Sequence, residues 1–143
     1  MKSTEQENTD SERESLPLIL IVEDDKFFGE IMVKKFTAEN FRVEHARHGA
    51  GALALFEKEP PHCVLLDAGL PDMDGLEVLR RIRAIPTGAK IPVVMMGNLN
   101  RQEDAKRALS FGANEFLPKM NFTSEEIAEH VRKIMQEHYV ELR

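Results

Sequence analysis

Short runs of aliphatic residues recur along the chain, and most are not interrupted by polar positions. Five runs predict strands, over residues 18–22, 41–44, 63–66, 91–96 and 115–117. Continuous apolar runs of this length are typical of strands buried on both faces of a parallel sheet. The second run differs, because Phe41 and Val43 alternate with charged residues and so indicate a strand with one wetter face.

Between the strands lie segments whose apolar residues recur at helical spacing. Phe28, Met32 and Phe36 lie four residues apart and would form one apolar stripe along a helix. Further helices are predicted over residues 50–57, 76–84, 104–111 and 127–135. Before the last of these, Thr123 and Glu126 have the spacing of a capping box, which indicates where that helix begins.

The alternation of strand and helix predicts an α/β fold with a five-stranded parallel sheet. Repeated strand–helix units are joined by right-handed crossovers, which place helices on both faces of the sheet. This domain is expected to span residues 16–143. Residues 1–15 are polar and rich in acidic residues. Because they offer little apolar surface to offset the entropy of ordering, they are predicted to form a disordered tail.

Composition and charge argue against several classes of partner. The formal net charge of −6 speaks against nucleic acid, because binding to a duplex relies on neutralising its phosphates. The one basic cluster, at Arg80, Arg81 and Arg83, is interpreted as the solvated face of a helix. No apolar stretch approaches the roughly 20 residues that span a membrane. The single cysteine, Cys63, cannot form an intramolecular disulfide, which fits a cytoplasmic location.

Charged residues follow the predicted strands at their carboxyl ends, where such sheets bind ligands. Glu23, Asp24 and Asp25 follow the first strand. Asp67 ends the third strand, and Lys119 follows the fifth. If the first and third strands are neighbours, carboxylates about 5 Å apart would repel by about 3 kcal/mol at an effective dielectric of about 20. A cation is therefore expected, and Mg²⁺ fits because it prefers hard oxygen ligands and is commonly held by carboxylates and a phosphate.

Asp67 is the strongest candidate for a nucleophile in this cluster. Carboxylates can form acyl-phosphate intermediates, and a metal ion together with Lys119 would stabilise charge on the transferring phosphoryl oxygens. Simpler interpretations exist for its neighbours: Asp25 would serve as a helix N-cap, and Lys119 alone could be a solvated surface lysine. An Asp that closes an apolar strand has no comparable local explanation.

Four segments together carry a resemblance to a known family. They are residues 19–25 (ILIVEDD), 65–75 (LLDAGLPDMDG), 91–96 (IPVVMM) and 112–119 (GANEFLPK). In this order and spacing they resemble the receiver domains of bacterial response regulators, and the resemblance covers residues 17–138. It implies a flavodoxin-like (βα)5 fold, a doubly wound parallel sheet with the strand order 2-1-3-4-5.

The resemblance also implies a role for each residue of the acidic cluster. Asp67 matches the phosphoacceptor of the family. Glu23 and Asp24 match its acidic pair, with Asp24 a direct Mg²⁺ ligand and Glu23 acting partly through water. The backbone carbonyl of Gly69 matches the group that completes the metal shell together with Asp67. Lys119 matches the lysine that stabilises the phosphoryl group.

Two positions depart from the family pattern. Gly97 stands where the family has Thr or Ser, whose hydroxyl bonds a phosphoryl oxygen. Backbone, water or a neighbour such as Asn98 would have to replace this bond, whose loss costs roughly 1.5–3 kcal/mol. Phe116 matches the aromatic switch position that normally responds to that hydroxyl. Met120 follows Lys119 where the family has a proline after a cis bond, so the loop is expected to be either trans or strained.

The function that follows is that of a stand-alone, single-domain receiver in a two-component phosphorelay. A histidine kinase or phosphotransfer protein would phosphorylate it, and it would signal by binding an unidentified downstream protein. The face formed by helix four, strand five and helix five is the one that the family uses most often, and it could also support a homodimer. Such a protein is not an enzyme beyond its own phosphorylation and dephosphorylation. Gly69 and Leu99, at two positions that tune hydrolysis in the family, leave the site open.

The same residues are compatible with alternative functions, which differ in what they require of the sequence. The absence of a hydroxyl at Gly97 is compatible with a receiver-like docking module that works without phosphorylation. A phosphatase of the haloacid dehalogenase type would place its nucleophile after the first strand in an Asp-x-Asp pattern, where this chain has Glu23-Asp24-Asp25. A flavodoxin would need that same loop to cradle a phosphate, which three acidic residues would repel.

Overall fold

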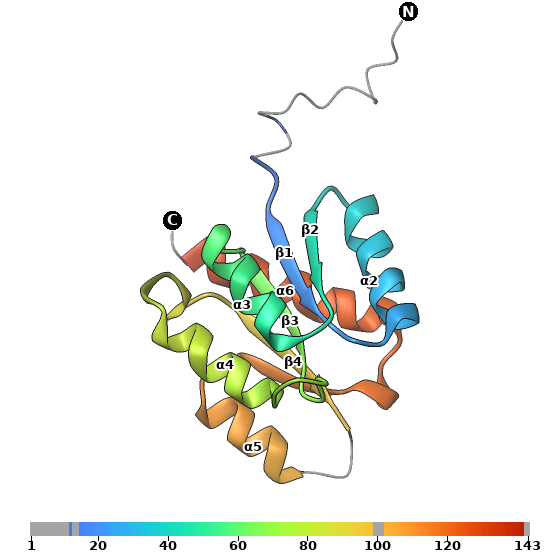
Figure 1. Cartoon of the computed structure of the whole chain (residues 1–143). Coiled ribbons are helices and arrows are strands. Elements are labelled where there is room, and N and C mark those ends of the chain that lie inside the picture. Colours follow the sequence, from blue (N-terminus) through green and yellow to red (C-terminus); the bar gives the residue numbers. More distant parts are fainter. Residues whose placement is uncertain (1–11, 13–14, 99–101, 142–143) are drawn as a thin grey trace, which may run out of the picture.

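The five strands lie side by side in one parallel sheet in the order β2-β1-β3-β4-β5 (Figure 1). The structure is a computed structural model that describes residue 12 and residues 15–98 and 102–141. The strands are β1 (Leu18–Val22), β2 (Arg42–Ala46), β3 (Cys63–Asp67), β4 (Val93–Gly97) and β5 (Glu115–Pro118). The strand order expected from the resemblance is confirmed.

Helices cover both faces of this sheet. They are α2 (Lys26–Ala38), α3 (Gly49–Lys58), α4 (Gly75–Ala84), α5 (Gln102–Ser110) and α6 (Ser124–Glu141). Helices α2 and α6 pack on one face, and α3, α4 and α5 pack on the other (Figure 1). The 3₁₀ turns η2 (Pro86–Gly88) and η3 (Lys119–Asn121) precede β4 and α6. The predicted doubly wound α/β fold is therefore confirmed.

The core consists of two apolar layers that share the central strands. In β1, Leu20 and Val22 belong to the layer beneath α3, α4 and α5, whereas Ile19 and Ile21 belong to the layer beneath α2 and α6. Successive side chains of a strand point to opposite faces, so a strand covered on both sides must be apolar throughout. This is why the central strands appear in the sequence as uninterrupted aliphatic runs.

The boundaries of the elements follow local chemistry. Asp25 caps α2 as predicted, since its Oδ1 accepts a hydrogen bond of 3.1 Å from the Phe28 amide. The predicted capping box is also present: the Glu126 amide donates to Thr123 Oγ1 at 3.1 Å, and the Thr123 amide donates to Glu126 Oε1 at 2.8 Å. Strand β4 begins two residues later than predicted, because Pro92 has no N–H to donate to a ladder.

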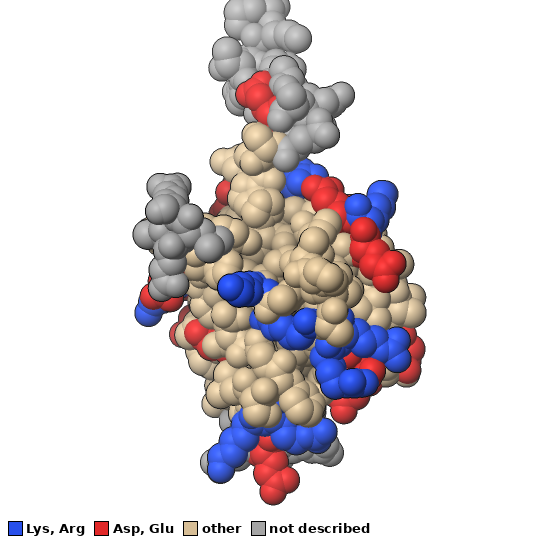
Figure 2. Space-filling model, turned by 90° about the vertical axis from the view of Figure 1, so that its left-hand side faces the viewer, with Lys and Arg blue, Asp and Glu red and all other residues tan. Residues whose placement is uncertain are grey.

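The basic cluster on α4 is only partly a solvated face. Arg80 and Arg81 are exposed and pair with Glu77, as the prediction requires. Arg83 does not fit that interpretation, because its guanidinium donates to the carbonyls of Ile91 and Gly112, each at 2.6 Å. It therefore links α4 to the segment before β4 and to the turn between α5 and β5. Figure 2 shows one face of the molecule, on which basic and acidic side chains both occur among uncharged ones.

Some predictions cannot be compared with the structure. Leu99 and most of the predicted tail, residues 1–15, lie outside the described residues. Among the helices that the structure does describe, none combines the length and the apolar character needed to cross a membrane.

Candidate functional site

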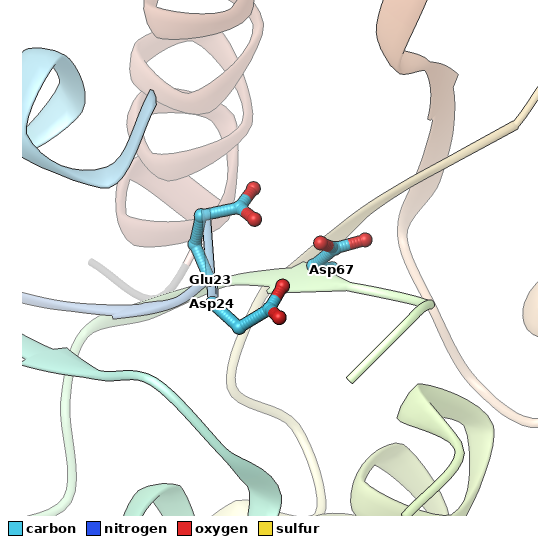
Figure 3. A group of neighbouring side chains, drawn as sticks. All are labelled: Glu23, Asp24 and Asp67. Atoms are coloured by element: carbon cyan, nitrogen blue, oxygen red, sulfur yellow. The ribbon is translucent and has the colours of Figure 1, made fainter. Parts of the chain in front are cut away.

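The carboxyl ends of β1 and β3 meet at one edge of the sheet and bring three acidic residues together. The two strands are direct neighbours, with Val22 opposite Leu66. The residues that follow are therefore adjacent as well, and the carboxylates of Glu23, Asp24 and Asp67 offer oxygens that lie within 4.8 Å of one another. Figure 3 shows the side chains of Glu23 and Asp24 directed toward Asp67. The predicted convergence is confirmed for these three residues.

Two of the three carboxylates are buried. Glu23 has an exposed fraction of 0% and Asp67 of 7%, whereas Asp24 is exposed. Burial of charged groups is unfavourable unless they are paired or bound to a metal ion. The arrangement therefore calls for positive charge at this edge of the sheet.

Lys119 supplies one positive charge from the end of β5. Its Nζ lies 2.6 Å from Glu23 Oε1 and 3.5 Å from Asp67 Oδ2. The ring of Phe28, at the start of α2, packs against the ammonium group with its centroid 4.8 Å from Nζ. Lys119 is thus a partly buried partner of the acidic cluster, and the solvated surface lysine is the wrong interpretation.

The titration of these groups reflects their crowding. Burial raises the pKa of Glu23 to about 7, the hydrogen bond with Asp67 adds to this effect, and the bond from Lys119 opposes it. Burial alone would lower the pKa of Lys119, but its contacts with the two carboxylates outweigh burial and raise that pKa above its ordinary value. One ammonium group is therefore not enough to keep both buried carboxylates fully ionised at neutral pH.

The donor set fits a divalent cation. Three carboxylates beside one ammonium leave a formal charge of −2, which one divalent cation would neutralise. All the side-chain donors are hard oxygen atoms, the ligands that Mg²⁺ prefers. Asp24 is the accessible member, while Glu23 and Asp67 form the buried side of the cluster. These residues would hold the ion between the ends of β1 and β3.

A hollow of about 430 Å³ opens beside Asp67. It extends from Asp67 and Lys119 to α5 and gives solutes access to the Asp67 carboxylate. Its lining comprises Asp67, Ala68, Gly69, Asp74, Leu76, Gly97, Asn98, Asp104, Arg107, Phe116 and Lys119. The hollow is large enough for a phosphoryl group and brings Gly69, Gly97, Phe116 and Lys119 to one site, as their predicted roles require.

Asp67 has a local partner that the sequence did not reveal. The amide of Gly69 donates a hydrogen bond of 3.1 Å to Asp67 Oδ1. This turn fixes the orientation of the carboxylate and leaves Oδ2 on the side of Lys119. The expectation that Asp67 has no local partner was therefore wrong. The bond from Gly69 orients the carboxylate, but it does not explain why Asp67 is buried beside Glu23.

The loop between β3 and α4 contains structural residues that sequence reasoning missed. Asp72 accepts hydrogen bonds from the amides of Gly49 and Ala50, at 2.7 and 2.9 Å, and these bonds lower its pKa. Asp74 caps α4 by accepting from the Leu76 amide at 2.9 Å. Both acidic residues stand within the segment LPDMDG, whose density of Asp and Gly was a signal for such turns.

Gly97 and Phe116 are in direct contact. A Cβ atom at position 97 would lie 2.5 Å from Cζ of the Phe116 ring, which is too close for two non-bonded carbon atoms. The ring therefore occupies the space that a Thr or Ser side chain would need.

The peptide bond between Lys119 and Met120 is trans, because no peptide bond among the described residues is cis. The Met120 side chain is 82% exposed.

Comparison with known proteins identifies the family. The model of the response regulator receiver domain matches residues 19–132. The chain belongs to this family. It is 38% identical to the response regulator PleD of Caulobacter vibrioides over 101 residues, which make up 71% of this chain and 22% of that protein. It is 32% identical to the response regulator MprA of Mycolicibacterium vanbaalenii over 118 residues, 82% of this chain and 50% of that protein.

Solved structures agree with this assignment. The CheY-like receiver domain protein from Methanospirillum hungatei is 27% identical, with a TM-score of 0.82, and the match covers 89% of this chain and 99% of that one. The chain spans about a fifth to a half of the length of the curated relatives PleD and MprA. It is therefore a receiver domain of two-component signalling. Receiver domains bind Mg²⁺ at an acidic pocket, act as phosphoacceptors rather than as enzymes, and interact with histidine kinases or phosphotransfer proteins.

Proposed function

We propose that this receiver accepts a phosphoryl group on Asp67 in a Mg²⁺-dependent reaction and signals by binding another protein. The observation that carries the proposal is the position of the Asp67 carboxylate. It is buried and oriented by Gly69, it stands beside Lys119, and it opens onto the hollow. A histidine kinase or phosphotransfer protein would be the donor, and the cytoplasmic location predicted from the sequence is part of the same proposal.

The transfer would exchange one bond to phosphorus for another. A carboxylate oxygen of Asp67 attacks phosphorus, the bond to the imidazole nitrogen of the donor breaks, and that nitrogen keeps the electron pair. Mg²⁺, when bound, supplies charge neutralisation at the phosphoryl oxygens. Lys119 already lies 3.5 Å from Asp67 Oδ2 and would donate to the new phosphoryl group. Glu23 and Asp24 would hold the ion, with the carbonyl of Gly69 and the carboxylate of Asp67 completing its shell.

No hydroxyl side chain is available at position 97 to bind the phosphoryl group. Asn98 is exposed and lines the hollow beside Gly97, so its amide offers a side-chain donor at the end of β4. We assign it the role that Thr or Ser has elsewhere in the family. Phe116 remains our proposed switch residue, and its ring already lies against Gly97.

Intact mass after incubation with acetyl phosphate tests the proposal. Wild-type protein should gain one phosphoryl group in the presence of Mg²⁺ and none in the presence of a chelator. Asp67→Asn should gain none. Asp72→Asn is the matched control, because Asp72 stands in the same loop but bonds α3 rather than lining the hollow, and it should be modified like the wild type. Modification of Asp67→Asn to the wild-type extent would contradict the proposal.

The contact between Gly97 and Phe116 favours a second candidate function. If the ring stays on Gly97 in every state, the surface formed by β5 and its flanking helices does not change on phosphorylation. The chain would then be a docking module that recognises its partner, or a second copy of itself, without phosphate. Amide NMR shifts with and without beryllofluoride and Mg²⁺ distinguish the two functions. Shifts confined to the Asp67 pocket favour the docking module, and shifts that extend through β5 and α6 favour the phosphorylation-dependent receiver.

A further inference from the structure

The segment that carries the acidic pair is held from the side by the end of β2. The amide of Glu23 donates to the carbonyl of Ala46 at 2.9 Å. The carbonyl of Glu23 lies 2.9 Å from His45 Nε2, and the carbonyl of Asp24 accepts from Arg47 Nη2 at 3.1 Å. Because a carbonyl oxygen can only accept, His45 Nε2 must carry the hydrogen of that bond. Three successive residues, 45–47, thus bind the backbone of Glu23 and Asp24.

Gly29 provides the space in which the ring of His45 lies. A Cβ atom at position 29 would be 2.6 Å from Cε1 and 2.8 Å from Nε2 of that ring. Gly29 is buried within α2, although glycine is among the poorest helix formers. The close approach of the ring accounts for glycine at this position, so that His45 and Gly29 form a matched pair.

We propose that His45 is a positioning residue for the Mg²⁺ site, acting through the carbonyl of Glu23. The inference rests on the proposed function. The carboxylates of Glu23, Asp24 and Asp67 repel one another, so the segment after β1 would relax away from β3 if nothing held it. Its downstream end is fixed by the cap that Asp25 forms on α2, and its upstream end by β1. Between these ends, His45 binds the Glu23 carbonyl, beside the bonds that Ala46 and Arg47 make to the same stretch, and so helps to set where the Glu23 and Asp24 side chains begin.

Measuring both Mg²⁺ affinity and thermal stability shows whether His45 positions the Mg²⁺ ligands or only stabilises the fold. Isothermal titration calorimetry with MgCl₂ gives the Kd, and unfolding in the presence of a chelator gives the Tm. His45→Leu keeps the approximate volume but removes the donor, and it should weaken Mg²⁺ binding about tenfold, as loss of an outer-shell partner typically does. His45→Gln keeps an amide N–H at the reach of Nε2 and should restore most of that affinity.

His62→Leu is the matched control. His62 also bonds the backbone of β1, since its Nδ1 accepts from the Leu18 amide at 3.0 Å, but it does so at the opposite end of the strand. Its loss should lower the Tm and leave the Kd for Mg²⁺ unchanged. Loss of His45 should change both quantities.

Gly29→Ala tests the same ring from the other side. The added methyl group must displace the imidazole, so this variant should also bind Mg²⁺ several-fold more weakly. In a His45→Ala background the ring is absent, and Gly29→Ala should then have no further effect on the Kd. Such non-additivity is what two changes acting through one side chain produce.

The outcomes distinguish this inference from the function on which it rests. A wild-type protein that does not bind Mg²⁺ would overturn the proposed function and this inference together. A wild-type protein that binds Mg²⁺, with His45→Leu folded and equal to it in Kd, would overturn the inference alone. Equal weakening by His45→Leu and His62→Leu would also overturn it, because the effect would then follow stability.

Discussion

At the scale of single residues, Glu23 shows how a binding site is kept at the expense of stability. Its pKa is raised to about 7 in the folded protein from 4.5, chiefly by burial. Between these values the folded state binds more protons than the unfolded state, so the free energy of unfolding falls as the pH rises from about 4.5 to about 7. The ionised form of Glu23 therefore destabilises the metal-free fold at neutral pH.

Glu23→Gln should stabilise the metal-free protein and weaken its Mg²⁺ site. Without a carboxylate to ionise, the free energy of unfolding at pH 7.5 in a chelator should rise, on the order of 2 kcal/mol. Denaturant unfolding at pH 5 and pH 7.5 measures this, and the gain should shrink at pH 5. Glu57→Gln is the control for net charge, because Glu57 is exposed. An equal gain in both variants would show that overall charge, and not burial of Glu23, is responsible.

At position 97 the residue that the fold tolerates depends on the ring of Phe116. Gly97→Ala would place a methyl group against the ring of Phe116 and should lower the free energy of unfolding by about 1–3 kcal/mol, the usual range for overpacking. In a Phe116→Ala background the same change should cost little, because the ring is gone. A full cost in both backgrounds would mean that the strain arises elsewhere. The measurement is a double-mutant cycle in urea.

At the scale of elements, the site depends on how closely α4 approaches the end of β3. A Cβ atom at Gly75, the first residue of α4, would lie 2.5 Å from the Asp67 carbonyl oxygen and 2.6 Å from the Ala68 Cα. These are backbone atoms and cannot move aside as a side chain can. Glycine is required there because the helix starts directly over the strand end that presents Asp67.

Gly75→Ala should therefore destabilise the fold strongly, by about 3 kcal/mol, the upper part of the usual range for overpacking. Gly69→Ala is the matched control in the same loop, since a Cβ atom there would have no neighbour within 4 Å. That variant should unfold at nearly the wild-type urea concentration. If the two variants were equally stable, the close approach of α4 to β3 would not be a real constraint.

At the scale of the whole molecule, the sequence predicts what local pattern controls and misses what distant contacts control. The central strands could be predicted because a strand covered on both faces must be apolar throughout, and β2 because its apolar and charged residues alternate. The acidic cluster was found because the ends of parallel strands meet at one edge. The order of the strands came from the resemblance, since apolar runs do not say which strands are neighbours.

The misses have a common physical cause. Arg83 reaches the carbonyl of Gly112 across 29 positions of the sequence, and His45 bonds the carbonyl of Glu23 across 22. Neither contact leaves a periodic signal, because it depends on where the fold brings two remote segments. The same holds for Phe116 and Gly97: the missing hydroxyl was evident, but the ring that fills its place was not.

The pH dependence of folding also emerges only from the whole molecule. His62 joins the start of β1 to the last helix: its Nδ1 accepts from the Leu18 amide, and its carbonyl accepts from the Tyr139 hydroxyl at 2.6 Å. Burial, together with the nearby Arg42, lowers the pKa of His62 from 6.5. The unfolded state therefore binds a proton first as the pH falls, so His62 contributes stability above about pH 6.5 that is lost as the pH drops through the lowered pKa.

His62 and Glu23 should thus act in opposite directions over the same range of pH. Acidification from pH 7 to pH 5 relieves the buried Glu23 carboxylate, but it also favours protonation of His62, which the unfolded state accepts more readily because the folded state uses Nδ1 as an acceptor for the Leu18 amide. His62→Asn keeps an acceptor at the position of Nδ1 without the titration, so its stability should increase more on acidification than that of the wild type. Urea unfolding at half-unit steps of pH, in a chelator, gives the two curves. If they are parallel, His62 does not titrate in this range, and the contact that closes β1 onto α6 is insensitive to pH.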